Sequence, residues 1–478
     1  MKKWLTAIFI FVIILTIQSQ TFNDGMFSYK VIDATNNYVS IAKGATCPKG
    51  EVELPKTVNY NDTSYRVTHL ASNAFEDCTS ITKAIIPDGV TNIGEKAFSG
   101  CDRLTGITIP DSVTRIESWA FYSCMVLTEI TIPRVVTRIE SFVFLNCMSL
   151  TKIAIPNGAT HIERSAFKNC VSLTEIIIPN TVTSIKTGAF LNCIRLSNII
   201  LPDGLTHINT MTFWGCKSLT KISIPYGVTS IGDYSFEDCT NLIEIMLPNS
   251  LNTIGSWAFR GCTKLNHITI PEGVTRIGSL AFWKCTNLKT ITLPDSLTNL
   301  GSSAFWQCVN LTSITLPNGI TRIESSVFAN CISLAHVKLP DDLNYIETRA
   351  FSGCTNLSKV YIPIGVSIIE ENAFSDCVSL MNISLSENLT SIEGWTFTNC
   401  KSLINISLPN SITRIEREAF YGCTALRNVT VNWLPSKIIT IDSGIFGNVD
   451  ITSISLNVPQ GTASAYKKAK VWQDFNIR

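Results

Sequence analysis

The sequence lacks an excess of charge of either sign. Its 478 residues include 38 Lys and Arg against 37 Asp and Glu, a formal net charge of +1, and the basic residues form no run. Nucleic-acid-binding proteins neutralise phosphates with clustered Lys and Arg, so this balance argues against such a partner. We therefore expect no nucleic acid among the partners of this protein.

Long apolar runs are also lacking, except at the start. Lys2 and Lys3 precede a 14-residue apolar run, Trp4 to Ile17, and polar residues follow it. This order is typical of a secretory signal peptide, and the run is too short for an ordinary membrane span. We predict that residues 1–20 are a signal peptide, that the protein is secreted or on the cell surface, and that no membrane span remains after signal removal. An uncleaved anchor is the alternative, because only Ser19 marks a cleavage site.

The sequence also lacks the motifs that mark catalytic, cofactor-binding or metal sites. It shows no metal-ligand spacing, no glycine-rich phosphate loop and no nucleophile elbow. An enzyme needs convergent polar groups, whereas the few histidines here are spread along the chain. We predict no catalytic, cofactor-binding or metal site and no cofactor, so the protein is not expected to be an enzyme. The five histidines are His69, His161, His207, His267 and His336.

What the sequence has is a repeat with a period of 23 residues. Sixteen cysteines, from Cys78 to Cys423, follow this spacing, and a phenylalanine lies three residues before each of them. One copy, residues 262–284, reads CTKLNHITIPEGVTRIGSLAFWK. A fixed period of this length indicates a solenoid in which each copy stacks on its neighbours.

The pattern within one copy predicts its local structure. Apolar and polar residues alternate over Leu265 to Pro271, which favours a strand. Val274 to Ile277 favour a second short extended segment, and Ser279 to Cys285 favour a helical turn. Six or seven buried side chains contribute roughly 10 to 20 kcal/mol, less than the backbone entropy of about 1 to 2 kcal/mol for each residue of a copy. Single copies therefore cannot fold alone. We predict an α/β-type repeat solenoid with a parallel β-sheet, short second strands and helical turns, mostly β and irregular.

Segments outside the period predict caps on the solenoid. Residues 21–69 are predicted to form an N-terminal β cap with a hairpin around Asn36-Asn37, and residues 70–432 to form sixteen 23-residue repeats. Residues 433–478 are predicted to form a last partial repeat and a C-terminal cap, with a short helix over Ala463 to Lys470 and with Trp472 and Phe475 closing the end.

The repeat unit L-T-x-I-x-I-P-x-x-V-T-x-I-x-x-x-A-F-x-x-C resembles the BspA-type leucine-rich repeats over roughly residues 70 to 450. The ending VPQGTASAYKKAKVWQDFNIR resembles the tails of such proteins from Bacteroidetes-like bacteria. The resemblance implies a right-handed parallel coil in an exported or surface-exposed protein. It also implies adhesion to host matrix proteins or to other microbes, as in some family members.

Seventeen cysteines in an exported chain suggest disulfides. Neighbouring copies would place their cysteines close enough to bond, but pairwise bonding would make alternate copies unlike, and the sequence shows no such alternation. We favour a ladder of reduced, buried thiols that donate weakly to turn carbonyls, with inter-copy disulfides as the alternative.

A column of glutamates follows the second extended segment in many copies. Arginines two residues earlier, such as Arg115, Arg138, Arg322 and Arg414, could pair with them diagonally. We favour an exposed charged ladder over calcium binding, because no Asp-rich loop is present. The glutamates are Glu117, Glu140, Glu163, Glu324, Glu347, Glu370, Glu393 and Glu416, and glycine replaces them at Gly232, Gly255, Gly278 and Gly301.

Tryptophans give the strongest indication of a binding surface. Trp283 and Trp306 occupy the same position in adjacent copies and should stack, with Trp257 one copy away. The candidate binding patch is Trp214, Trp257, Trp283 and Trp306. The alternative is that these rings only fill junctions between copies.

Together, these features predict a non-catalytic exported or cell-surface protein that mediates recognition or adhesion. Its partner would be a protein or glycan, with a host matrix protein as one candidate. The alternative function is a structural or self-associating cell-surface component. The oligomeric state is left open.

Overall fold

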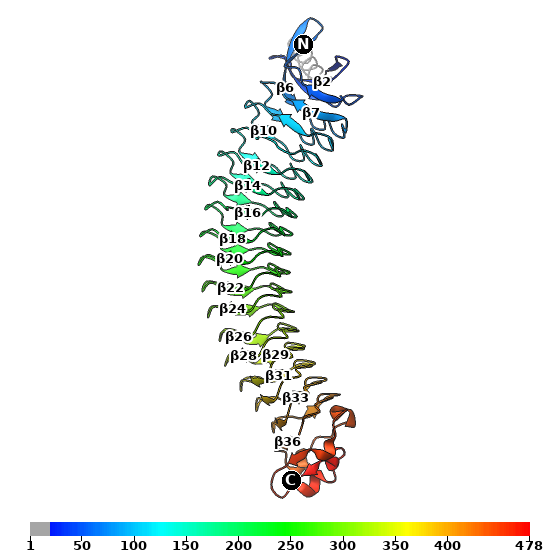
Figure 1. Ribbon diagram of the computed structural model, residues 1–478, viewed down its shortest axis with the longest axis vertical. Coiled ribbons are helices and arrows are strands. Elements are labelled where there is room, and N and C mark those ends of the chain that lie inside the picture. The colour runs from blue at the N-terminus through cyan, green and yellow to red at the C-terminus, as the bar shows by residue number, and fades with distance from the viewer. Residues whose placement is uncertain (1–19) are drawn as a thin grey trace, which may run out of the picture. The chain divides into compact units, whose positions relative to one another are not determined.

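The computed structural model describes residues 20–478, and the chain folds into two compact units that meet at Gly227 and Val228. In each unit the strands of successive copies lie one above the other (Figure 1). The predicted signal peptide, residues 1–20, lies outside the described residues except for Gln20. Within residues 20–478, no helix has the length and apolar character needed to cross a bilayer.

Most copies supply two short strands, and many of these pair in parallel and in register with the strands of the next copy. Ile153 pairs with Ile176 on the first-strand side, and Ile139 pairs with Ile162 on the second-strand side. The parallel sheet and the short second strands are therefore as predicted.

The strands of the first unit's copies alternate along the chain between first and second strands. Its first strands are β7 (Ile81–Ile85), β9 (Gly106–Thr108), β12 (Lys152–Ala154), β14 (Glu175–Ile177), β16 (Asn198–Ile199) and β18 (Lys221–Ser223). Its second strands are β8 (Asn92–Ile93), β10 (Arg115–Ile116), β11 (Arg138–Ile139), β13 (His161–Ile162), β15 (Ser184–Ile185) and β17 (His207–Ile208).

The second unit continues the same alternation. Its first strands are β20 (Glu244–Met246), β22 (His267–Thr269), β24 (Thr290–Thr292), β26 (Ser313–Thr315), β28 (His336–Lys338), β30 (Lys359–Tyr361), β32 (Asn382–Ser384), β34 (Asn405–Leu408) and β36 (Asn428–Val431). Its second strands are β19 (Ser230–Ile231), β21 (Thr253–Ile254), β23 (Arg276–Ile277), β25 (Asn299–Leu300), β27 (Arg322–Ile323), β29 (Tyr345–Ile346), β31 (Ile368–Ile369), β33 (Ser391–Ile392) and β35 (Arg414–Ile415).

The turn between the second strand and the cysteine is not helical, which corrects the predicted helical turn. In the copy of residues 262–284, Leu280 and Lys284 have φ of 59° and 61°, in the left-handed region. The same two positions are left-handed in the other copies, and a left-handed residue every four positions is incompatible with a right-handed helix. The turn is instead a tight double bend that aims the phenylalanine and the cysteine inward.

The core of each unit consists of columns of identical side chains. The phenylalanine rings stack along each unit with centroids 5.1 to 5.8 Å apart. Beside them, each free thiol donates to the carbonyl oxygen of the phenylalanine one copy back, as in Cys147 Sγ to Phe121 O at 3.2 Å. The predicted donation of thiols to turn carbonyls is thus confirmed.

The N-terminal segment contains the predicted hairpin, in which β2 (Ser28–Asp33) and β3 (Tyr38–Ala42) pair antiparallel. Its other strands are β1 (Thr21–Asn23), β4 (Gly50–Glu53), β5 (Thr57–Tyr60) and β6 (Thr63–Leu70). Two of them extend the stacks of the copies, because β4 pairs in parallel with β7 and β6 with β8.

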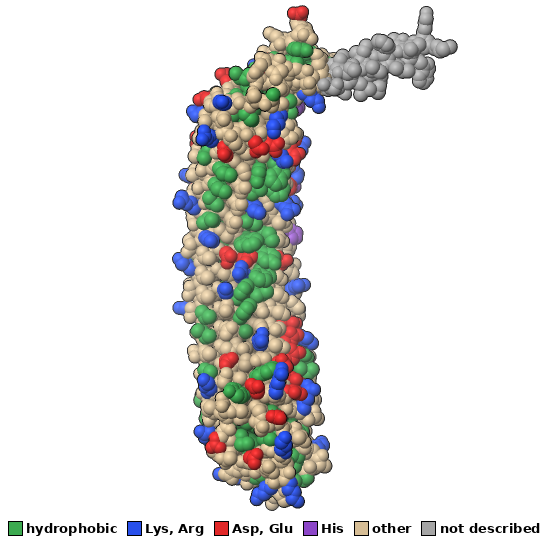
Figure 2. Space-filling model, turned by 90° about the vertical axis from the view of Figure 1, so that its right-hand side faces the viewer, with side chains coloured by type: hydrophobic (Ala, Val, Ile, Leu, Met, Phe, Trp, Pro, Cys, Tyr) green, Lys and Arg blue, Asp and Glu red, His purple; other side chains and the backbone are tan. Residues whose placement is uncertain are grey.

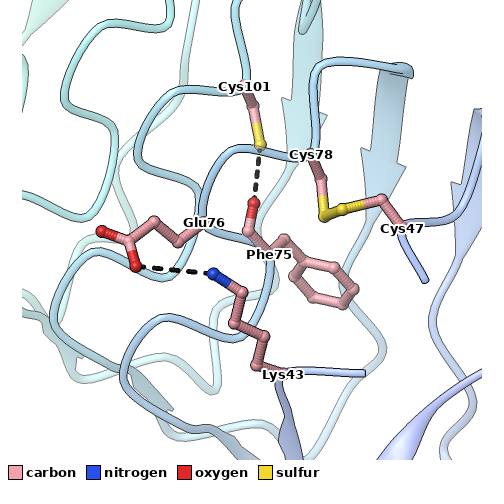
Figure 3. Close-up of a disulfide and its surroundings, with 6 residues drawn as sticks. All are labelled: Lys43, Cys47, Phe75, Glu76, Cys78 and Cys101. Carbon is pink, nitrogen blue, oxygen red and sulfur yellow. Dashed lines mark hydrogen bonds and ion pairs between the residues drawn. A yellow bond between two sulfur atoms is a disulfide. The ribbon is translucent and has the colours of Figure 1, made fainter. Parts of the chain in front are cut away.

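One disulfide, Cys47–Cys78, joins this segment to the first copy (Figure 3). Cys78 is therefore an exception to the predicted ladder of reduced thiols, whereas the fifteen cysteines from Cys101 to Cys423 are free and buried. Cys78 differs from the later cysteines because it lies in the first copy. Cys101 can donate to Phe75 O, but Cys78 has no complete copy before it to accept its proton.

The C-terminal segment closes the second unit with buried aromatic rings. Trp433, Tyr466 and Trp472 are fully buried, and Phe446 continues the phenylalanine stack 5.3 Å from Phe420. The predicted closing role of Trp472 is confirmed, but the helix is shorter than predicted. The elements are η1 (Pro435–Lys437), η2 (Ser443–Phe446), η3 (Ile451–Ser453), β37 (Ser455–Asn457), α2 (Ala463–Tyr466), η4 (Trp472–Asp474) and β38 (Asn476–Ile477).

Candidate binding surfaces

A groove of about 980 Å³ lies on the first-strand side of the first unit. It extends across six successive chain segments, from Glu51 in β4 to Ile177 in β14. Small side chains line its middle, among them Gly106, Thr108 and Ala154. This groove, defined by these lining residues, was not predicted from the sequence.

The copy in the middle of the groove is irregular. All other copies from Cys78 to Cys423 form a first strand, but in the Cys124 copy the equivalent residues Glu129, Ile130 and Thr131 belong to no strand. The turn side of this copy is regular, because Phe121 and Phe144 stack at 5.7 Å and Ser123 N donates to Leu145 O at 2.8 Å. At the start of the strand segment, Thr128 N still donates to Thr105 O at 3.4 Å and Thr151 N to Thr128 O at 3.2 Å, so the irregularity begins after Thr128.

Val135 explains this irregularity. It stands eleven residues after the cysteine, where most other copies have Gly, Ser or Thr. Ser112 Oγ donates there to Val90 O at 2.7 Å, and at Gly273 a Cβ would lie 2.9 Å from Leu251 O. Val135 is branched and has no donor, so it can neither fit closely nor bond that carbonyl. Its side chain is 50% exposed.

Charges in the groove alternate in sign along the copies. Lys83 lies 3.8 Å from Glu51, and Lys152 lies 3.8 Å from Glu175. Between these pairs, Glu129 is exposed and forms no ion pair with any residue of the described part of the chain. Arg134 of the same copy also lines the groove, so the lining carries three acidic and three basic side chains. Glu129 and Arg134 are the two of these that form no ion pair within residues 20–478.

An exposed apolar pair begins at one end of the groove, where Ile177 lines it, and continues beyond the lining with Ile200. Figure 2 shows that apolar side chains gather in patches on one face of the surface. Ile177 and Ile200 occupy the same strand position in adjacent copies, seven residues after the cysteine, and are 62% and 76% exposed. Most other copies have a smaller or polar residue at this position, such as Thr269 and Thr292. We call this position the outer strand position.

The second unit brings three of the four predicted tryptophans together. Trp283 and Trp306 stack with centroids 4.9 Å apart and planes 5° apart, as predicted, and Trp257 meets Trp283 edge to face at 5.4 Å. Tyr234 extends the row by stacking on Trp257 at 5.7 Å. Trp214 belongs to the first unit, apart from the other three. All four tryptophans are half-buried.

Cations interleave with these rings. The Arg260 guanidinium lies 5.3 Å from the Trp257 ring centroid and 4.6 Å from that of Trp283, and Lys284 Nζ lies 4.8 Å from the latter. Arg260 also forms an ion pair with the buried Glu237. Burial raises the pKa of Glu237 despite the opposing effect of Arg260. The row of Tyr234, Trp257, Trp283 and Trp306 with its cations is called the aromatic row below.

The aromatic row includes strained backbone. Trp257 has φ of 61° and Tyr234 has φ of 58°. A bulky residue in the left-handed region costs roughly 1 to 2 kcal/mol. Asn372 and Gly188 hold the same position in other copies without that cost, so the turn itself does not require an aromatic residue there.

The glutamate column serves contacts between copies. Glu347 accepts from Ser325 N of the preceding copy at 2.9 Å and from Arg322 Nη1 at 2.6 Å, so the predicted diagonal pairing is present. Glu370 likewise accepts from Thr348 N at 3.0 Å. These carboxylates are engaged by protein donors, which supports the charged-ladder interpretation.

Histidines and cysteines are held by local partners. Thr160 Oγ1 lies 2.8 Å from His161 Nδ1, and Thr206 Oγ1 lies 2.8 Å from His207 Nδ1. Burial raises the pKa of the Cys147 thiol to about 12. Within residues 20–478, no three His, Cys, Asp or Glu side chains gather as metal ligands would.

Comparison with known families gives one clear match. The sequence profile of the BspA type leucine-rich repeat region, which spans six copies, matches residues 68–196, 160–285, 258–380 and 345–469. These ranges together cover most of the chain. A comparison with curated proteins finds no match.

One solved structure shares this fold, and another is similar to the chain in sequence. A leucine-rich repeat protein from Bacteroides ovatus is 27% identical, with a TM-score of 0.66, over 92% of this chain and 100% of that one. A leucine-rich cell surface protein from Faecalibacterium prausnitzii is 26% identical, with a TM-score of 0.35, over 94% of this chain and 97% of that one.

Proposed function

The chain belongs to the BspA-type leucine-rich repeat family, and on that premise we propose that it is an exported, non-catalytic protein that recognises other proteins or glycans. The partner we consider first is a host matrix protein. Recognition would use the outer surface of the solenoid, whose interior is filled by the columns of the core.

The observation that carries this proposal is the set of apolar side chains at the outer strand position. Ile177 and Ile200 in the first unit, and Met246 and Tyr361 in the second, expose between 56% and 76% of their surface there. Folding does not require an apolar residue at this position, because other copies have Thr or Ser there. Large exposed apolar groups that folding does not need are typical of interaction surfaces.

The aromatic row supports a second contact area. Its rings remain half-buried, and its backbone strain at Trp257 is not required by the turn. Strained positions of this kind concentrate at functional sites. We propose that Trp257, Trp283 and Trp306 form a binding patch in the second unit, with Trp214 a separate contact in the first.

The disulfide supports export. Cys47–Cys78 is a bond that forms and persists in oxidising compartments rather than in a reducing cytosol. It agrees with the signal peptide proposed for residues 1–20. Cell fractionation with an antibody against residues 21–478 tests the location, and a protein confined to the cytosol would contradict it.

Binding to immobilised matrix proteins and polysaccharides tests the function. We expect residues 21–478 to bind at least one of them by surface plasmon resonance, with Met246→Asp weakening binding at the second unit. Thr269→Asp, at the same position of the adjacent copy, is the matched control. Sizing by light scattering distinguishes the structural alternative, because self-association with concentration and no binding to the panel would favour it.

Replacement of Trp283 and Trp306 by Ser tests the tryptophan patch. We expect weaker ligand binding, by about tenfold, with the fold retained as judged by circular dichroism. Ile364→Ser is the matched control, because Ile364 is an exposed apolar residue of the same unit outside both proposed contact areas. Unchanged binding by the double variant would assign these rings to packing.

A further inference from the structure

We propose that the groove of the first unit binds an extended segment of a partner protein. A basic side chain of that segment pairs with Glu129, and an apolar side chain three or four residues away packs on Ile177 and Ile200. This inference names the face and the partner chemistry for the proposed recognition function, and it rests on that function.

The dimensions of the groove fit an extended peptide. It crosses six neighbouring segments, from β4 to β14, which lie about 4.8 Å apart in a sheet. Its length is therefore roughly 24 Å, which an extended chain covers in about seven residues. A folded domain would need a broader surface than this narrow strip.

The charged side chains of the groove indicate where a basic residue of the partner segment would bind. Lys83 and Lys152 are already matched by Glu51 and Glu175, each at 3.8 Å. Glu129 lies between these pairs and has no ion-pair partner among residues 20–478. Glu129 is therefore available to a Lys or Arg of the partner, and Arg134, the other unpaired charge of the lining, is available to an acidic residue.

The exposed isoleucines define the apolar residue. Ile177 lies two copies beyond Glu129 and Ile200 lies three copies beyond it, at the outer strand position. Two steps between copies, combined with the offset of two residues along the strand, correspond to a separation of roughly 12 Å. An extended chain bridges that separation with three or four residues.

The irregular Cys124 copy offers backbone groups to the same segment. Glu129, Ile130 and Thr131 belong to no strand, although their neighbours β9 and β12 do. Where the peptide crosses this copy, single main-chain groups there can form hydrogen bonds with it, because they lie outside the paired strands. The opening produced by Val135 is thus what makes the groove able to bind.

The lining favours a protein segment over a glycan. None of the residues that line the groove is aromatic, so it offers no ring face on which a sugar could stack. Its alternating charges also do not suit a polyanion, because Glu129 would repel it. Exposed isoleucine beside a free carboxylate instead matches an apolar and a basic side chain.

A peptide library tests the proposal. Random twelve-residue peptides displayed on phage are selected on residues 21–478 with the disulfide intact, and the affinities of enriched peptides are measured by fluorescence anisotropy. We expect a basic and an apolar residue three or four apart, with Glu129→Lys or Ile200→Asp weakening binding about tenfold. Changing the basic residue of the peptide to Glu should restore binding to the Glu129→Lys variant.

Matched controls lie at the same strand positions of the second unit. Ser313→Lys corresponds to Glu129→Lys, and Thr315→Asp corresponds to Ile200→Asp; both should bind the peptides as the unchanged protein does. Peptides that bind Glu129→Lys with full affinity would overturn the groove proposal and leave the recognition function standing. If no peptide is enriched and no matrix protein or polysaccharide binds, both proposals fail.

Discussion

The free cysteines that open the copies from Cys101 onward are buried, and their thiols donate hydrogen bonds to backbone carbonyls. Cys147 donates to Phe121 O at 3.2 Å, and Cys331 donates to Phe305 O at 3.1 Å. Burial raises the pKa of both thiols to about 12, against an ordinary value of 9.0. These thiols are packing groups, and their reactivity should be suppressed in the folded protein.

Alkaline pH should destabilise the protein through these thiols. Between pH 9 and about 12 the folded state keeps protons that the unfolded state releases, so stability present below pH 9 is lost as pH rises. Each thiol contributes about 1.4 kcal/mol per pH unit to this loss. Urea midpoints measured at pH 8, 9 and 10 without oxygen should fall steeply.

Thiol labelling is the companion measurement to the alkaline titration. At pH 8 the folded chain should not react with a thiol reagent, and the unfolded chain should expose its fifteen free cysteines. Rapid labelling of the folded chain, or midpoints that stay constant with pH, would contradict the account of the ladder.

Single residues also show why the helical turn was predicted wrongly. The residue before each cysteine is left-handed in every copy, and Asn146, Asn169 and Asn192 hold it in three successive copies. Asn, Asp and Gly favour this conformation, so the sequence did carry the signal. The prediction instead followed the length of the segment and overlooked this recurrent residue type.

At the scale of elements, Val135 accounts for the missing first strand of its copy. Val135→Ser should let the hydroxyl donate to Val113 O, as Ser112 Oγ does to Val90 O. We expect a gain of about 1 kcal/mol in the free energy of unfolding. Amide exchange at Ile130 should slow as the strand pairs, and peptide binding in the groove should weaken.

Val135→Ala serves as the control for that substitution, because it removes the branch without supplying a donor. It should give a smaller gain than Val135→Ser. A loss of stability in Val135→Ser, with exchange at Ile130 unchanged, would show that the irregular copy has another cause.

The disulfide links the N-terminal strands to the first copy and so to one end of the groove. Cys47→Ala opens a loop whose ends are 31 residues apart, and loops of that size contribute roughly 3 to 4 kcal/mol in the chain-entropy account. We expect faster amide exchange in β1 to β4, and weaker peptide binding because Glu51 follows Cys47 closely.

A reductant should reproduce the effect of Cys47→Ala in the unchanged protein and add nothing in the variant. The reductant should act on this disulfide alone, because the free cysteines are already reduced. Equal exchange in β1 to β4 with and without the disulfide would show that the packing of this segment does not depend on it.

Some elements of the structure could be predicted from the sequence, and the groove could not. The period, the paired strands, the N-terminal hairpin and the stacking of Trp283 on Trp306 follow from residues at equal spacing, so the sequence suffices for them. The groove does not follow, because Val135 looks like one more apolar residue until the copies are stacked. Only then does it meet a carbonyl that it cannot bond.

At the scale of the whole molecule, the copies are alike where they pack and unlike where they face solvent. Phe, Cys and Leu recur because each must fill the same column. Ile177, Ile200, Met246 and Tyr361 differ from their counterparts at a position that needs no apolar group. We therefore locate recognition in these departures from the repeat.

The most direct test of this claim is hydrogen exchange on residues 21–478 with and without a selected peptide, followed by mass spectrometry. We predict slower exchange in β7, β9, residues 129–132, β12 and β14, and no change in β26 or β28. Protection confined to the phenylalanine turns, or spread evenly over the copies, would contradict the claim that recognition lies at the irregular strand side of the first unit.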